Sequence, residues 1–316
     1  DEQCKGLVFW PELSHSDILM LEYFSKSAWN RVDEKNFMSD FCEDRYGKDA
    51  PAMLQLWQSL WPLMPLRVWQ LDPEAAIEDI HQEYFFDILG YRPLTSWPEA
   101  KLASWHETLH TLPMVLESCG QVLLQAAPLW ERKEPFLNRD RVDIVRTALG
   151  RALNGMLLRL VCDSRDGYWQ EAMAKDYMQL LTLLCDVLDS HEDYSQYVTL
   201  EGLKRLHAVN PIFEPVLMQN LVNGYCRGYA SEFMRNLCVS ENKAYLLWLQ
   251  ESAYGGGIPA DTKWLKEEKE RLYTAYMART LKEMRPTRPT HMEQRLKRTA
   301  QRLAELSKLL GERGTA

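Results

Sequence analysis

Two short stretches of the sequence carry residue types that could do chemistry. The first is His106-Glu107-Thr108-Leu109-His110, which matches the pattern H-E-x-x-H. On a helix this spacing places both imidazoles on one face, where they can bind zinc while the glutamate acts as general base. A catalytic zinc ion needs a third protein ligand, and no Gly-x-x-His segment follows. A zinc metallopeptidase built on His106, Glu107 and His110 is therefore an alternative hypothesis.

The second stretch surrounds Glu12. An apolar run, Leu7-Val8-Phe9-Trp10, ends at Pro11 and is followed by Glu12 and an apolar periodic segment. This order predicts a buried strand, a carboxylate at its end, and a helix. A lone strand has no partner for its backbone N–H and C=O groups, so we expect partner strands elsewhere. A carboxylate in this position is where catalytic groups lie in a (β/α)₈ enzyme.

The elements that must position these residues are almost all helical. Residues 141–162 and 169–189 repeat apolar side chains every three or four positions, as amphipathic core helices do. The short turn between them, residues 163–167, predicts antiparallel neighbours. Further helices are predicted at residues 17–29, 34–46, 50–60, 73–89, 98–110, 114–126, 199–208, 215–237 and 241–252. Outside residues 6–10 there is no clear strand signal, so the sequence predicts an all-α fold.

The strongest break in the chain is Gly255-Gly256-Gly257-Ile258-Pro259. A charged helix is predicted after it, at residues 261–284, and a basic helix follows the prolines of Arg285-Pro286-Thr287-Arg288-Pro289. Three arrangements are open for this last helix: packing on the body, pairing with another helix, or lying on an acidic surface. The pattern favours a solvated amphipathic helix.

Composition excludes several classes of protein. The formal net charge of −8 disfavours nucleic acid as a partner, and the longest apolar runs are too short for a transmembrane span. Seven cysteines, an odd number without a CxxC pair, predict free thiols. The acidic residues Asp186, Asp189, Glu192 and Asp193 lack the pattern of a calcium loop and predict a solvated turn. No motif calls for a cofactor.

Two parts of the sequence resemble a known family. Gly6 to Glu12, then Asp17, then Phe24 to Trp29, and later Arg45-Tyr46-Gly47, are similar to the α-N-acetylglucosaminidases of glycoside hydrolase family 89. In that family a G-x-x-x-x-P-E-G segment ends the last barrel strand, followed by an Asn, an apolar helix ending in Trp, and R-Y-G. A second part, residues 125–128 and 141–146 with the two long helices, resembles the family's C-terminal all-helical domain.

The resemblance implies an architecture. Residues 1–33 would be the last strand and helix of a (β/α)₈ barrel whose remainder is absent from this chain. Residues 34–254 would form the antiparallel helical domain, and residues 255–316 a Gly-rich break and a charged helical tail. The missing catalytic barrel and a glycan with terminal α-linked N-acetylglucosamine are then the implied partners, and a secreted or periplasmic bacterial location is implied as well.

The resemblance also implies a reaction, the removal of terminal non-reducing α-linked N-acetylglucosamine with retention. Retention needs a nucleophile and an acid/base about 5–5.5 Å apart. Glu12 matches the family's nucleophile, Trp10 and His15 would lie near the substrate, and the acid/base has no counterpart here, so we expect this chain alone to be inactive. Leu13 and Asp17 depart from the family's glycine and asparagine, which bears on substrate choice. A non-catalytic helical interaction module using the basic C-terminal helix is a further alternative.

Overall fold

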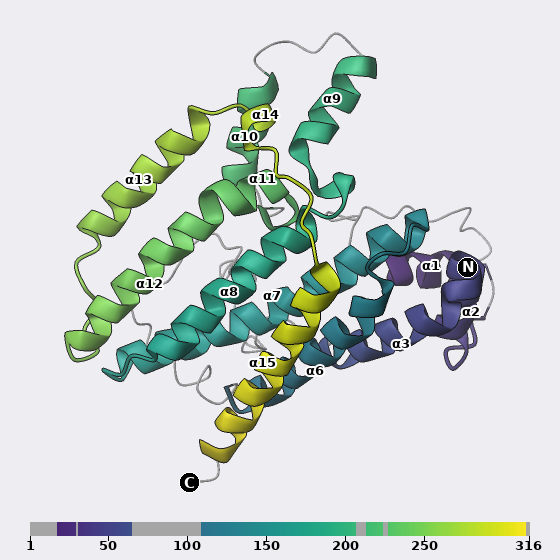
Figure 1. Ribbon diagram of the computed structural model, residues 1–316, viewed down its shortest axis with the longest axis horizontal. Helices are drawn as coiled ribbons and strands as arrows, with labels where there is room; N and C mark the ends of the chain where they lie inside the picture. The colour runs from purple at the N-terminus through teal and green to yellow at the C-terminus, as the bar shows by residue number, and fades with distance from the viewer. Residues whose placement is uncertain (1–17, 30, 65–108, 207–212, 224–226, 314–316) are drawn as a thin grey trace.

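The computed structural model describes residues 18–29, 31–64, 109–206, 213–223 and 227–313, and these ranges are helical without any strand (Figure 1). The predicted all-α character is therefore confirmed for them. The predicted strand at residues 6–10 and the helix at residues 73–89 lie outside the described residues. The same holds for most of the helix predicted at residues 98–110.

The α-helices are α1 (Ile18–Ser27), α2 (Phe37–Tyr46), α3 (Ala50–Leu60), α6 (Leu112–Ala126), α7 (Pro135–Arg165), α8 (Glu171–Leu188), α9 (Gln196–Leu206), α10 (Phe213–Asn223), α11 (Ser231–Phe233), α12 (Val239–Tyr254), α13 (Lys263–Met277), α14 (Leu281–Met284) and α15 (Met292–Arg313). Short 3₁₀ turns include η2 (Trp61–Leu63), η3 (Leu109–Thr111), η4 (Ala127–Leu129), η5 (Glu192–Tyr194) and η6 (Arg227–Tyr229). A π-helical turn, η7 (Met234–Cys238), joins α11 to α12.

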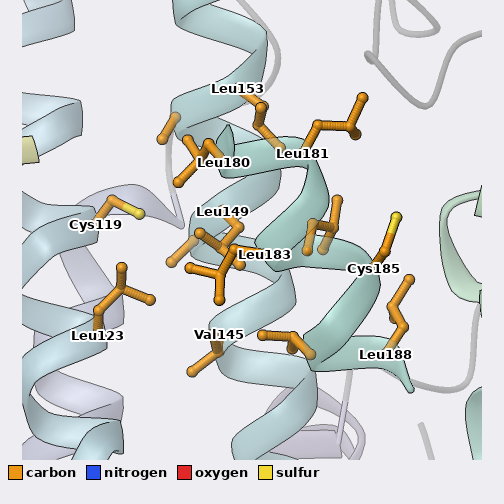
Figure 2. Close-up of a cluster of buried hydrophobic side chains, with 14 of the residues drawn as sticks. Cys119, Leu123, Val145, Leu149, Leu153, Leu180, Leu181, Leu183, Cys185 and Leu188 are labelled. Atoms are coloured by element: carbon orange, nitrogen blue, oxygen red, sulfur yellow. The ribbon is translucent and has the colours of Figure 1, made fainter. Parts of the chain in front are cut away.

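Helix α7 is the centre of the fold. It packs against α6 on one side and α8 on the other, and it also contacts α3 and α12. Figure 2 shows Val145, Leu149 and Leu153 of α7 between side chains of α6 and α8, such as Leu123 and Leu180. Because α7 is enclosed on several sides, many of its polar residues are buried as well as its apolar ones. The predicted antiparallel pair of α7 and α8 is confirmed (Figure 1).

The basic C-terminal helix α15 packs on the body along α6 (Figure 1). Leu296, Ala300 and Leu303 are buried in this contact. Gly120 of α6 allows the close approach, since a Cβ atom there would lie 3.3 Å from the carbonyl oxygen of Ala300. Ser307 Oγ donates a hydrogen bond to the carbonyl of Pro113 at 2.8 Å. The preference for a solvated tail is wrong, because the leucine stripe of this helix is covered by α6.

Two predicted helices are interrupted. The helix expected at residues 215–237 ends at Asn223 and resumes at Ser231, and the carbonyl of Gly228 between them accepts a hydrogen bond from Arg146 Nε at 3.1 Å. Glycine is a poor helix former, and the bond from Arg146 holds this stretch against α7. The helix expected at residues 261–284 stops at Met277. Thr280 then opens α14 with a capping box to Glu283.

The packing of α15 gives a testable expectation. Leu303→Ala removes a side chain that is 2% exposed, whereas Leu309→Ala truncates a leucine of the same helix that is 50% exposed. We expect Leu303→Ala to lower the free energy of unfolding by about 2–5 kcal/mol, because it leaves a cavity against α6. Leu309→Ala should change it by less than about 1 kcal/mol. Urea unfolding followed by circular dichroism measures both, and equal losses would contradict the packing described here.

Candidate functional site

Most of the predicted site residues lie outside the described part of the chain. This applies to Trp10, Glu12, Leu13, His15 and Asp17 of the glycosidase hypothesis. The structure does describe the helix that directly follows them, α1. The site can therefore be built from the elements that hold α1 in place.

The zinc hypothesis has the same limit, since His106 and Glu107 also lie outside the described residues. His110 is exposed in the 3₁₀ turn η3, just before α6. Among the described residues, no group of three or more His, Cys, Asp or Glu side chains could hold a metal ion. Nothing in the described geometry therefore favours the zinc hypothesis.

Helix α1 is anchored on α2 and on the loop before it. Leu19 is buried, and the ring of Tyr23 packs edge-on against Phe37 with centroids 5.2 Å apart. The Tyr23 hydroxyl donates to Glu34 Oε1 at 3.2 Å, and this bond raises the pKa of the phenol. These contacts fix the start of α1, where the segment carrying Glu12 joins the body.

A surface groove of about 680 Å³ runs beside α1, between this helix, α2 and η2. Met20, Tyr23, Met38 and Trp61 contribute to its walls, and Trp61 is 52% exposed. Its one lining carboxylate, Glu34, is bonded to Tyr23. This groove is therefore mainly apolar and suits packing rather than acid–base chemistry.

Helix α2 is in turn tied to α7 by a buried ionic cluster around Asp140, which we call the Asp140 cluster (Asp140, Arg45, Tyr46, Arg139 and Trp57). The Asp140 side chain is fully buried and accepts from Arg45 Nε at 2.5 Å, Tyr46 OH at 2.9 Å and Arg139 Nη1 at 3.0 Å. Trp57 Nε1 donates to Tyr46 OH at 3.1 Å. A buried carboxylate of this kind is stable only while its partners remain, so the cluster locks α2 and α3 onto α7.

Further arginines of α7 are held by aromatic rings and backbone carbonyls. The Arg141 guanidinium lies 4.4 Å from the centre of the Trp130 ring and donates to the carbonyl of Leu129, and burial lowers its pKa to about 10. Arg146 lies 3.6 Å from the centre of the Tyr229 ring and donates to its hydroxyl at 2.8 Å. These side chains connect α7 to η4 and η6 and serve the fold.

The acidic cluster at the end of α8 is only partly the solvated turn that the sequence predicted. Glu192 and Asp193 are exposed, but Asp186 is buried and only 1% of the Asp189 side chain is exposed. Arg235 of the π turn η7 donates to both, and Arg295 of α15 pairs with Asp186. The prediction is wrong for these two residues, because partners distant in the sequence cover them. Burial raises the pKa of Asp189 to about 6 despite the nearby Arg235.

A buried glutamate that the sequence gave no reason to single out caps α9. Glu232 is fully buried, and its carboxylate accepts from Ser195 Oγ at 2.5 Å and from the backbone N–H groups of Gln196 at 2.9 Å and Tyr197 at 3.2 Å. N–H groups at a helix start lack intrahelical partners, and a carboxylate satisfies them. The only signal in the sequence is a single glutamate within a mostly apolar segment, residues 229–234.

The described cysteines are structural. Cys42, Cys119, Cys162, Cys185 and Cys238 are buried and not joined in disulfides, which confirms the prediction for these five. Burial raises the pKa of Cys42, Cys162 and Cys185 to about 12, and it also raises that of Cys119. Thiols with such pKa values remain protonated near neutral pH and are poor nucleophiles.

Comparison with family models, curated proteins and solved structures finds no match to this chain. Among its described helices, none is both long and apolar enough to cross a membrane. The function must therefore be argued from the residues and their geometry.

The Asp140 cluster predicts a large stability effect. Asp140→Ala leaves the Arg45 guanidinium without its buried carboxylate, so we expect the free energy of unfolding to fall by about 3–5 kcal/mol. Asp44→Ala is the matched control, because Asp44 pairs with Lys26 at 3.2 Å but its side chain is 73% exposed. That exposed pair should contribute at most about 1 kcal/mol. Similar losses in the two variants, measured by urea unfolding, would contradict a structural role for the cluster.

The raised pKa of Asp189 predicts an unusual pH dependence of the free energy of unfolding. Its ordinary pKa is 3.8 and its folded-state pKa is about 6, so the folded protein holds this proton more tightly than the unfolded chain. The contribution of Asp189 to the free energy of unfolding should therefore increase as pH falls from about 7 to about 4. Asp189→Asn removes this contribution. Subtracting the variant's urea-unfolding profile from that of the wild-type protein should reveal the gain on acidification, and parallel profiles would refute it.

Proposed function

We propose that this chain is the C-terminal part of a retaining α-N-acetylglucosaminidase-like glycosidase, with Glu12 as nucleophile. The acid/base would come from barrel strands outside these 316 residues. One observation carries the proposal: the two parts of the sequence that resemble family 89 meet in space. Arg45 and Tyr46 of the first part form hydrogen bonds to Asp140, which lies directly before residues 141–146 of the second part. If both parts belong to one family fold, we expect them to contact each other in this way.

The proposed reaction has two steps. The Glu12 carboxylate attacks the anomeric carbon while the acid/base protonates the departing glycosidic oxygen, which gives a glycosyl-enzyme. The acid/base then removes a proton from water, which attacks the anomeric carbon and releases the sugar and Glu12. Trp10 and His15 are proposed to line the substrate side of this site. Such chemistry requires the nucleophile to be held in a fixed place.

The helical body is suited to hold it. Contacts run from α7 through the Asp140 cluster to α2, and from α2 through Tyr23 and Leu19 to α1, which begins shortly after Glu12. The apolar groove beside α1 offers a surface on which a neighbouring barrel can pack. In this proposal the described residues position the catalytic segment and make no direct contact with the reacting atoms.

The test uses the complete protein that the gene encodes. It should cleave an aryl α-N-acetylglucosaminide, and Glu12→Gln should reduce turnover by several orders of magnitude without changing the melting temperature, because an amide cannot act as nucleophile. Glu22→Gln is the matched control, since Glu22 lies on α1 and pairs with Lys26 at the surface. Its turnover should equal that of the wild-type protein.

Two outcomes would contradict the proposal. One is undiminished turnover in Glu12→Gln. The other is a coding sequence upstream of Asp1 without the repeated strand–helix units that a barrel requires.

A further inference from the structure

The turns that join α7 to α8 and α12 to α13 lie against each other at one end of the helical body (Figure 1). Gly257 has a φ of 80°, and a Cβ atom there would overlap the carbonyl oxygen of Arg165. Gly167 has a φ of 75°, and its Cβ atom would lie 3.5 Å from the backbone of Gly256. Glycine alone adopts such conformations at no cost, so the two turns meet backbone to backbone and hold each other in place.

Large side chains project from these fixed turns. Tyr254 is 75% exposed, Ile258 69% and Tyr168 51%. Tyr254 ends α12, and Tyr168 follows Gly167 in the facing turn. Rigidly presented tyrosines supply contact area at little entropic cost, because few bonds must be immobilised on binding. A cluster of exposed rings on a preorganised surface is characteristic of a binding site.

A chain of hydrogen-bonded side chains connects Trp169, in the turn after α7, with Tyr254 at the end of α12. Trp169 Nε1 donates to Glu171 Oε2 at 2.8 Å, and Gln250 Nε2 lies 3.3 Å from the same oxygen and 3.4 Å from the Tyr254 hydroxyl. The Glu171 side chain is exposed and Gln250 is half-buried. A carboxylate and an amide therefore lie within hydrogen-bond distance of the polar atoms of Trp169 and Tyr254, and both groups have further capacity to bond to a ligand.

The local charge narrows the class of ligand. Glu171 at the start of α8 and Glu251 on α12 are both exposed, and Arg165 pairs with Asp166. This surface repels anionic polymers such as nucleic acids, whose binding needs an excess of lysine and arginine. Aromatic faces accept the C–H face of a pyranose ring, and adjacent carboxylate and amide groups bond to its hydroxyls. A neutral sugar can contact the aromatic side chains and also form hydrogen bonds with the carboxylate and the amide.

We propose that this surface, the two-turn platform (Tyr168, Trp169, Glu171, Gln250 and Tyr254), binds a neutral oligosaccharide. The expectation that the oligosaccharide contains N-acetylglucosamine rests on the proposed function. The platform lies at the end of the helical body opposite α1 (Figure 1). It therefore gives the protein a second place to hold an extended glycan.

The test titrates the 316-residue chain with a soluble oligomer of N-acetylglucosamine and, in parallel, with a glucose oligomer of the same length. Isothermal titration calorimetry should give saturable binding in the millimolar range or tighter. Tyr254→Ala should weaken it at least about tenfold, a loss of about 1.4 kcal/mol. Phe213→Ala, which truncates an exposed aromatic residue at the start of α10, should leave the affinity unchanged. Melting curves of both variants verify that the fold is intact.

Three results would overturn the platform: no saturable binding of either oligomer, equal affinity in Tyr254→Ala and wild type, or binding of an oligolysine peptide without binding of sugar. Tyr254-dependent binding of the glucose oligomer alone supports the platform and overturns its preference for N-acetylglucosamine. Because this experiment involves no turnover, its failure is distinct from failure of the Glu12→Gln test.

Discussion

The enclosure of α7 is the constraint on which the rest of the structure depends. A helix covered by neighbours on several sides must find partners inside the fold for every charged group it carries. Asp140 finds them on α2, Arg141 on η4, and Arg146 on η6. Each partner fixes the position of the element that supplies it. The arrangement of the helices around α7 is therefore determined by buried hydrogen bonds and ion pairs as well as by the burial of apolar surface.

This constraint also bears on the proposed activity. Arg45 and Tyr46 occupy positions of the family resemblance, and in the structure Arg45 neutralises the buried Asp140 carboxylate while Tyr46 donates a hydrogen bond to it. A residue pattern can thus persist in a chain because it holds two segments together, even where no reaction occurs. In the proposed glycosidase these contacts would help to hold the nucleophile in its reactive position, because catalysis requires the reacting groups to be held in a fixed geometry.

The helices that depend on local pattern could be predicted from the sequence. Residues 141–162 and 169–189 form the core pair because their apolar spacing is regular along the whole segment. The sequence could not show which polar residues that lie far apart in the chain come into contact in the fold. Asp189 is adjacent to exposed acidic residues in the sequence, yet Arg235 covers it. The leucine stripe of α15 favoured a solvated helix when only the sequence was considered, and the fold shows that it packs on α6. The residues predicted for catalysis lie outside the described ranges, so their geometry stays a prediction.

The π turn between α11 and α12 has a consequence for how this chain can change. A π turn holds one residue more than the α-helical turn it replaces, so η7 shifts the register of everything that follows it. If the same residues wound as an ordinary α-helix with none deleted, the extra residue would rotate α12 by about 100° about its own axis. Trp248, now fully buried, would then point toward a different neighbour. The wider π turn therefore keeps the present buried face of α12 in the core, even though its residues are individually unexceptional.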